Sequence, residues 1–377
     1  MILLVIAVIL AAILYFLFWP TRVSPQAWNP PQAPSLAEEP YRLNDKLKAL
    51  QRIATVGAVG PEGINLDAEG RIYAGYLDGR VMRFAPDGGS GEVLANTGGR
   101  PLGMAPLADG RLLVADAIKG LVQIDSSRGV TVLATEADGL PFGFTNDLDV
   151  AESGEVVFFS DSSHKWGTGQ DIQDIVEHGG HGRLLRYDFR TRKASVLLKG
   201  LQFANGVAIG PNEDYVLVTE SSEYRVQRYW LKGPKAGCAE IFIDNLPGFP
   251  DNISYNGRDR FWLAIAAPRH PLIDLLANKP FLRQVLSRIP ASLQPKPVRH
   301  CIVLALDLGG KVVANLQHAG PDAYWKITSA CEFGPWLYCG SVDETAIGRM
   351  PLSDIFADAP PSAVPQQKAV RTAPALE

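Results

Sequence analysis

The sequence predicts an all-β fold, and three observations support this prediction. Apolar or alternating segments of strand length recur with a period of about 40 to 50 residues, from Val56 to Leu352. The chain holds 36 Gly and 28 Pro, scattered between these segments as turn residues. Helical stretches between the strands, which a two-domain α/β protein would need, are missing. Repeats of this length with several strands each are typical of a β-propeller.

Six turn-like segments, each leading into an apolar strand, predict six blades. They are Gly60–Gly63, Arg100–Gly103, Phe144–Asp147, Phe203–Gly206, Phe249–Asn252 and, less clearly, Lys326–Ser329. We therefore expect a six-bladed β-propeller over residues 42–353. The segment from Leu50 to Val56 is expected to complete the sixth blade by pairing with the C-terminal strands.

The composition favours a globular protein and excludes one class of partner. Of 377 residues, 46% are hydrophobic, which is enough for a large core, and the net charge of −4 gives no reason to expect nucleic acid. The four cysteines are too few for a disulfide scaffold. Cys331 and Cys339 could pair across a hairpin, or all four could be free thiols.

The first 41 residues predict a membrane anchor and a linker. Ile2 to Trp19 is an unbroken apolar run with aromatic residues at its end and no basic residue before it. This pattern favours an uncleaved transmembrane helix, residues 1–20, over a signal peptide. Residues 21–41 hold five prolines and predict an extended linker. Residues 354–377 are rich in Pro and Ala and predict a flexible tail.

Two units carry long insertions. The insertion in unit three runs from His164 to His181 and is rich in Gly and polar residues. Unit five carries residues 268–298, whose apolar residues have roughly helical spacing, so a short helical insertion is expected in blade five. A lid over a pocket, a contact with the membrane surface and simple packing on the rim are all open for it.

Polar residues stand at matched positions of four predicted blades. These are Glu62, Asn146, Asn205 and Asp251, and the turns that carry them should ring one mouth of the central channel. Such an all-oxygen set suits a hard cation, first of all Ca²⁺. Asn252 and Asp147, next to two of these residues, are expected as further ligands or as their supports.

A calcium ion at this mouth would suit the hydrolysis of a lactone or ester, with a small-molecule substrate. Asp251 is the candidate nucleophile or general base. A histidine of the insertions would carry protons, and His164 is the candidate, with His178, His181 and His270 as alternatives.

Several motifs also make the chain resemble a known family. GPEGINLD, FTNDLDV, FANGVAI and above all YRVQRYWLKGPKAG and LPGFPDN resemble the strictosidine synthase-like branch of the calcium-dependent six-bladed propellers, which include paraoxonases and gluconolactonases. The resemblance covers about residues 42–352. It implies that Glu62, Asn146, Asn205 and Asp251 bind a catalytic calcium ion and that Asn252 is an additional ligand.

The resemblance also shows departures. Strictosidine synthase has a glutamate in blade six where this chain has Thr328, which argues against a condensing activity. Paraoxonases have a histidine in blade two where this chain has Leu102.

The sequence thus predicts a single-pass membrane protein, with its propeller on the non-cytoplasmic side, that hydrolyses esters or lactones with Ca²⁺. A non-catalytic, calcium-stabilised binding module is the first alternative, and a condensing enzyme is the second.

Overall fold

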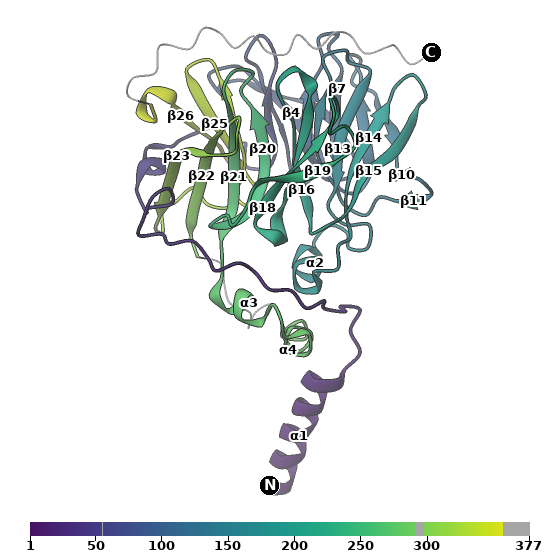
Figure 1. The fold of residues 1–377 in the computed structure, drawn as a ribbon, viewed down its shortest axis with the longest axis vertical. Helices are drawn as coiled ribbons and strands as arrows, with labels where there is room; N and C mark the ends of the chain where they lie inside the picture. Colours follow the sequence, from purple (N-terminus) through teal and green to yellow (C-terminus); the bar gives the residue numbers. More distant parts are fainter. Residues whose placement is uncertain (55, 291–297, 357–377) are drawn as a thin grey trace.

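The computed structural model describes residues 1–54, 56–290 and 298–356. Six four-stranded antiparallel sheets form the blades of a propeller, which confirms the predicted all-β, six-bladed fold (Figure 1). Most of the predicted flexible tail, from residue 357 on, lies outside the described residues.

Blades one to five each take four consecutive strands of the chain, running from the innermost strand to the outermost. Blade one has β2 (Ile64–Leu66), β3 (Ile72–Gly75), β4 (Arg80–Phe84) and β5 (Gly91–Asn96); blade two has β6 (Pro101–Pro106), β7 (Leu112–Asp116), β8 (Gly120–Ile124) and β9 (Val130–Ala134). Blade three has β12 (Thr145–Val150), β13 (Val156–Asp161), β14 (Gly182–Asp188) and β15 (Lys193–Leu201), and blade four has β16 (Ala204–Ile209), β17 (Tyr215–Glu220), β18 (Arg225–Trp230) and β19 (Ala239–Ile243). Blade five has β20 (Gly248–Tyr255), β21 (Arg260–Pro268), β22 (His300–Asp307) and β23 (Val312–Ala319).

Blade six closes the ring with both ends of the propeller sequence. It combines β24 (Ile327–Phe333), β25 (Trp336–Ser341) and β26 (Ile347–Pro351) with β1 (Gln51–Ile53) as its outermost strand. β1 pairs antiparallel with β26, Gln51 opposite Arg349, so the predicted closure by the Leu50–Val56 segment is confirmed. Cys331 and Cys339 lie on the neighbouring strands β24 and β25 as free thiols.

The hydrophobic core lies between neighbouring blades. Leu113 and Leu121 of blade two pack with Leu148, Phe159 and Tyr187 of blade three in one such layer. Similar layers join the other blades, because each sheet is apolar on both faces along its inner three strands. The outermost strands are more exposed; β9, for example, is exposed along Val130–Val132. Their mixed pattern explains why the sequence indicated three strands in several units and not four.

The helices and the N-terminal segment gather on one side of the propeller (Figure 1). They are α1 (Ile2–Phe18), α2 (Asp171–Glu177) in the blade-three insertion, and α3 (Pro271–Leu276) and α4 (Pro280–Leu286) in the blade-five insertion. The helical insertion predicted for blade five is thus present, whereas α2 was not expected. Other short elements are the hairpin β10 (Glu136–Ala137) and β11 (Leu140–Pro141) and 3-10 helices at Lys46–Ala49, Pro211–Glu213, Ser221–Glu223 and Leu352–Asp354.

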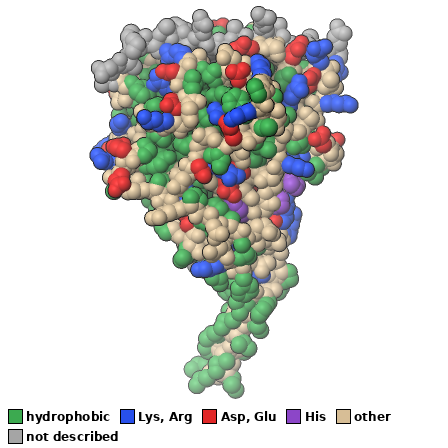
Figure 2. All heavy atoms as spheres, in the orientation of Figure 1, with side chains coloured by type: hydrophobic (Ala, Val, Ile, Leu, Met, Phe, Trp, Pro, Cys, Tyr) green, Lys and Arg blue, Asp and Glu red, His purple; other side chains and the backbone are tan. Residues whose placement is uncertain are grey.

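The helix α1 protrudes from this side and is covered by hydrophobic side chains, whereas charged side chains spread over the propeller (Figure 2). Among the described residues, no helix combines the length and the apolar character needed to cross a membrane. The transmembrane part of the predicted fold therefore stays a proposal.

The N-terminal segment, residues 22–32, lies as a strap across the helix side of the propeller. Its Gln26 backbone N–H donates to the Glu177 carbonyl at the end of α2 (2.8 Å), and its Trp28 N–H donates to the Ala277 carbonyl after α3 (3.2 Å). The Trp28 ring also stacks on His178, with centroids 4.2 Å apart. Arg283 of α4 donates to the Gln26 carbonyl (2.8 Å). The strap therefore joins the two insertions into one cover.

Candidate metal centre

The predicted ligand positions coincide with irregularities at the start of the inner strands. The register between the first and second strands shifts between Thr145 and Leu148, between Ala204 and Val207, and between Pro250 and Ile253. Each shift takes one or two residues out of the ladder and changes where their side chains point. The residues inside these shifts are Asn146 and Asp147, Asn205 and Gly206, and Asp251 and Asn252.

Blades two and six have the same irregularity, with different residues inside it. The shift in blade two takes in Leu102, and that in blade six takes in Thr328. The matched positions of blades two to six are therefore equivalent in the fold. Thr328 does not replace a carboxylate, because its hydroxyl donates to the backbone carbonyl of Glu62 (2.9 Å).

The five predicted ligands are all buried and share one feature. Glu62, Asn146, Asn205, Asp251 and Asn252, which we call the oxygen cage, are between 4% and 8% exposed. Each has one buried side-chain oxygen without a hydrogen-bond partner: Glu62 Oε2, Asn146 Oδ1, Asn205 Oδ1, Asp251 Oδ1 and Asn252 Oδ1. A buried acceptor without a partner is costly and uncommon, so five in one set of residues form a group of oxygens suited to bind a cation.

The amide nitrogens of the cage are held by serines, which orients the oxygens. Asn146 Nδ2 donates to Ser162 Oγ (2.9 Å), and that hydroxyl donates to the Ala204 carbonyl of the next blade (2.6 Å). Asn205 Nδ2 and Ser221 repeat the arrangement at 3.4 Å, with the Ser221 hydroxyl donating to the Pro250 carbonyl (2.6 Å). These serines tie each amide to the residue that precedes the next cage member.

Sequence reasoning missed these two serines, although a signal was present. Each follows an acidic residue at the end of the second strand, in Asp161-Ser162-Ser163 and Glu220-Ser221-Ser222. A comparison of the ends of the second strands, and not only of the turns before the first strands, would have found the repetition.

The backbone at the cage is packed too tightly for side chains at two glycines. A Cβ on Gly206 would lie 2.5 Å from Asn252 Cα, and one on Gly63 would lie 2.3 Å from the Leu102 carbonyl oxygen. Glycine at these places lets the inner strands approach each other around the channel axis. The cage members therefore converge although they are far apart in the sequence.

The electrostatics of the cage favour a cation. Burial, followed by repulsion from Glu62, raises the pKa of Asp251 well above its usual range. Burial raises the pKa of Glu62 to about 7, against the opposing effects of Arg100 and of the Asn252 amide, which donates to Glu62 Oε1 (3.2 Å). Burial also raises the pKa of Asp147. Positive charge placed among these carboxyls would stabilise their ionised forms.

The residues present fit Ca²⁺. Two carboxylates and three amide oxygens supply five hard ligands, and the six to eight oxygens that Ca²⁺ takes leave room for water or substrate. Among the described residues, no three His, Cys, Asp or Glu side chains form a group that could hold a metal ion. The oxygen cage is not such a group, because three of its five members are amides. Asp147 does not share the unpartnered oxygens, since its Oδ2 accepts from the Val207 N–H (2.8 Å).

A channel leads from the cage to the side of the propeller opposite the helices. It encloses a cavity of about 1380 Å³, with Gly63, Asp147 and Asn252 lining its inner end. Loop residues such as Glu152 and Asn212 line its outer mouth.

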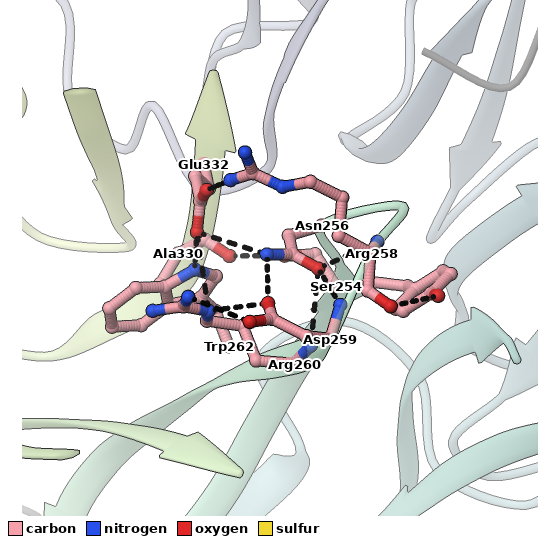
Figure 3. Close-up of polar contacts among 9 residues, drawn as sticks. Ser254, Asn256, Arg258, Asp259, Arg260, Trp262, Ala330 and Glu332 are labelled. Atoms are coloured by element: carbon pink, nitrogen blue, oxygen red, sulfur yellow. Dashed lines mark hydrogen bonds and ion pairs between the residues drawn. The ribbon is translucent and has the colours of Figure 1, made fainter. Parts of the chain in front are cut away.

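Near the outer mouth, Glu332 accepts hydrogen bonds from Arg258, from Trp262 Nε1 (2.9 Å) and from Asn256 Nδ2 (3.4 Å). Figure 3 shows these side chains pointing toward one another.

The histidines named from the sequence lie on the helix side, in different settings. His164 Nδ1 is 2.8 Å from the His181 carbonyl, so it carries the proton, and Nε2 lacks a partner among the described residues. Burial lowers the pKa of His164, which keeps the ring neutral. The other three histidines form hydrogen bonds: His178 with Glu223, His181 with Glu177, and His270 with the Leu272 N–H as the cap of α3.

Two family models match parts of the chain. A family model described as strictosidine synthase matches residues 146–234, and one described as strictosidine synthase-like, N-terminal, matches residues 39–84. These stretches contain Asn146, Asn205 and Glu62.

Named relatives cover most of the chain. Adipocyte plasma membrane-associated protein of Mus musculus is 32% identical over 353 residues, which are 86% of this chain and 84% of the relative. Protein strictosidine synthase-like 6 of Arabidopsis thaliana is 36% identical over 326 residues, 84% of this chain and 86% of the relative.

Solved structures share the fold. A gluconolactonase from Xanthomonas campestris superposes with a TM-score of 0.58 at 16% identity, over 89% of this chain and 99% of that one. The calcium-binding protein regucalcin from Agrobacterium tumefaciens gives a TM-score of 0.55 at 16% identity, over 80% and 90% of the two chains. With its relatives above 30% identity over most of both chains, this protein belongs to the strictosidine synthase-like family of six-bladed propellers.

Proposed function

We propose that the protein is a Ca²⁺-dependent hydrolase of small esters or lactones. The single observation that carries the proposal is the set of five unpartnered oxygens in the cage, which calls for a hard cation. Two structural neighbours add support, since one is described as a gluconolactonase and one as a calcium-binding protein. At their level of identity these neighbours establish only the fold.

Ca²⁺ held by Glu62, Asn146, Asn205, Asp251 and Asn252 would polarise the carbonyl group of the substrate. Asp251 is a buried carboxylate of the cage and would act on the substrate as nucleophile at the acyl carbon or as base toward water. His164 lies two residues after Ser162, the serine that holds Asn146, and its neutral ring offers Nε2 as a proton acceptor. These residues supply the groups that ester hydrolysis needs.

Ca²⁺ removal tests the proposal with two separate readouts. The full chain is stripped with EDTA and titrated with Ca²⁺ while its melting temperature and its hydrolysis of phenyl acetate and of a γ-lactone are measured. We expect Ca²⁺ to raise the melting temperature and to restore hydrolysis. A rise in melting temperature without hydrolysis of any ester or lactone would support a non-catalytic binding module, and full hydrolysis without metal would refute the proposal.

We also propose that the protein is anchored to a membrane with its propeller on the non-cytoplasmic side. The helix α1 exposes apolar side chains along its length, and α3 and α4 expose Leu275, Phe281 and Leu282 on the same side of the propeller. Arg288 joins these parts, because its guanidinium donates to the carbonyls of Trp19 (2.7 Å) and Phe16 (3.1 Å). The relatives described as plasma membrane-associated agree with this proposal.

Membrane extraction and flotation test the anchoring. We expect the full chain to stay with membranes at alkaline pH, and the L275E/F281E variant to bind vesicles less well than the wild type. Recovery of the wild type in the soluble fraction would refute the anchor. Protease protection in sealed membranes would decide the side on which the propeller lies.

A further inference from the structure

The wall of the central channel carries an excess of negative charge. Apart from Asp147 at the inner end, the residues that line it include six carboxyl groups and three guanidinium groups, so negative charges exceed positive ones by three. The six carboxyl groups belong to Asp67, Glu69, Asp149, Glu152, Glu213 and Glu332. A wall of this charge attracts cations and repels anions.

Each guanidinium group of the wall is bound to a carboxylate. Arg71 Nε lies 2.6 Å from Asp67 Oδ2, and both residues line the channel. The other two guanidinium groups use carboxylates from outside the wall. These pairs are Arg83 with Glu92 and Arg111 with Asp109. The guanidinium groups are therefore balanced by carboxylates beside them and do not turn the channel into a site for anions.

Asp149 is a carboxylate that the backbone holds in place between the two ends of the channel. Its Oδ1 accepts from the Val150 N–H (2.8 Å), and its Oδ2 accepts from the Ile209 N–H of β16 in blade four (2.8 Å). Asp147 binds the Val207 N–H of the same strand in the same way. Since alternate residues of a strand lie on one side, Asp147 and Asp149 follow one another from the cage toward the outer mouth.

Two more carboxylates stand together at the outer mouth. Glu152 is exposed, Glu213 is half-buried, and Glu213 Oε1 accepts from the Glu152 N–H (2.5 Å). Lys232 Nζ lies 3.9 Å from Glu213 Oε2, and its side chain is 55% exposed, so solvent screens this pair. The mouth therefore presents negative charge to the solvent.

The inner end of the channel reaches a member of the oxygen cage. Asn252 lines the channel, is 6% exposed, and its Oδ1 has no hydrogen-bond partner among the described residues. The cavity of about 1380 Å³ is large compared with the volume of about 30 Å³ that one water occupies, so it has room for a hydrated ion. The helix side differs, because it exposes the apolar side chains of Leu275, Phe281 and Leu282, which do not attract a cation.

We propose that the channel is the route by which Ca²⁺ enters and leaves the oxygen cage, from the side of the propeller opposite the helices. The inference rests on the Ca²⁺ binding of the proposed function and goes beyond it, because it gives the channel a role of its own. Glu152 and Glu213 raise the local concentration of Ca²⁺ at the mouth, and Asp149 attracts the ion between the mouth and the cage. The cage then exchanges its metal with solvent on the side away from α1.

Removal of the charges at the mouth gives the first experiment. Stopped-flow mixing of the full chain with Ca²⁺ and a fluorescent chelator measures association, and mixing of the Ca²⁺-loaded chain with excess chelator measures dissociation. We expect Glu152→Gln/Glu213→Gln to slow association about fivefold at low ionic strength and less than about twofold at about 0.5 M salt, with dissociation within about twofold of the wild type. Asp171→Asn, which removes a half-buried carboxylate of α2, is the matched control and should leave both rates unchanged.

An obstacle in the channel gives the second experiment. Ser254 lines the channel on β20, between Asn252 and Asn256, and its hydroxyl donates to the Ala330 carbonyl (2.7 Å). Ser254→Phe narrows the channel, so association and dissociation should both slow about tenfold while the dissociation constant stays within about twofold. An obstacle on a path raises the barrier in both directions and leaves the end states unchanged. Ser254→Ala loses the same hydrogen bond without adding bulk and should exchange Ca²⁺ as the wild type does.

Three results would overturn the route. They are an unchanged association rate in Glu152→Gln/Glu213→Gln, an equal slowing in Asp171→Asn, and rates in Ser254→Phe that match those in Ser254→Ala. In each of these cases the wild type still binds Ca²⁺, so the metal centre stands. If the wild type takes up no Ca²⁺ in the same mixing experiment, the metal centre of the proposed function fails, and the route fails with it.

Discussion

The side chains of Glu62 and Glu332 are both buried at the central channel, but they lie at its two ends and differ in their partners. Both oxygens of Glu332 accept hydrogen bonds, from Arg258 on one side and from Trp262 and Asn256 on the other (Figure 3). Glu62 Oε2 has no hydrogen-bond partner, and the four other residues of the oxygen cage also have one buried side-chain oxygen without a partner. Burial alone therefore does not distinguish these two carboxylates, whereas the presence or absence of hydrogen-bond partners does.

The largest expected effect is a difference in how much Ca²⁺ stabilises variants at the two ends of the channel. At a concentration 1000 times its dissociation constant, Ca²⁺ should stabilise the wild type by about 4 kcal/mol. Asp251→Asn should lose most of that gain, because a charged ligand is gone, while Glu332→Gln should keep it. Melting temperatures with and without Ca²⁺ measure the difference, and equal gains in both variants would contradict the comparison.

Asp174, on α2 at the helix side, is a third buried carboxyl to compare with Glu62 and Glu332. Asp174→Asn should be more stable than the wild type. Burial raises the folded-state pKa of Asp174 from 3.8 to about 6, so the folded state holds its proton more tightly than the unfolded state. Protonated Asp174 therefore adds to the free energy of unfolding. This gain is complete below about pH 4 and is lost as the pH rises through 6. It amounts to about 3 kcal/mol, because one pKa unit is about 1.4 kcal/mol.

Urea unfolding at pH 8 and at pH 4 measures this effect. We expect the gain of Asp174→Asn at pH 8 to approach 3 kcal/mol and the gain at pH 4 to be near zero. A loss of stability at pH 8 would mean that Asp174 has a structural partner.

The third effect is a loss of stability at the outer mouth of the channel, where Glu332 has its hydrogen-bond partners. Glu332→Gln should destabilise the protein by about 2 kcal/mol, because the charge-assisted hydrogen bond from Arg258 is weakened. The Arg258 side chain is 35% exposed, so solvent limits the cost. The same unfolding measurement checks this value, and a stability equal to that of the wild type would remove the structural role assigned to Glu332.

The sequence predicted more of the propeller blades and their inner turns than of the helix side. Glu62, Asn146, Asn205 and Asp251 could be aligned because each follows the same turn in its blade, and a propeller repeats that turn at one mouth. The closing strand was predictable from the count of units. These features are local patterns that repeat, so one chain contains several copies of each.

The helix side could not be predicted, since it depends on single, non-repeated contacts. The α2 helix has only seven residues, with Gly169 before it and His178 in a left-handed conformation after it, so its apolar pattern is too short to recognise. The burial of Asp174 depends on this helix and on the strap. The prolines of residues 21–41 indicated an extended segment, but its attachment to α2, α3 and α4 is a tertiary contact that composition does not encode.

The smallest effect concerns Ser162, which supports the cage without belonging to it. Its hydroxyl accepts from the Asn146 amide and donates to the Ala204 carbonyl, so Ser162→Ala should leave Asn146 free to turn and should lower Ca²⁺ affinity about tenfold. Ser341→Ala is the matched control, since Ser341 is also fully buried and donates to a backbone carbonyl, that of Trp325, without touching a cage amide. Calorimetric titration of the full chain with Ca²⁺ compares the two variants. If both lose affinity equally, the effect comes from general loosening of the blades; if only Ser162→Ala does, the orientation of the cage amide is what the serine provides.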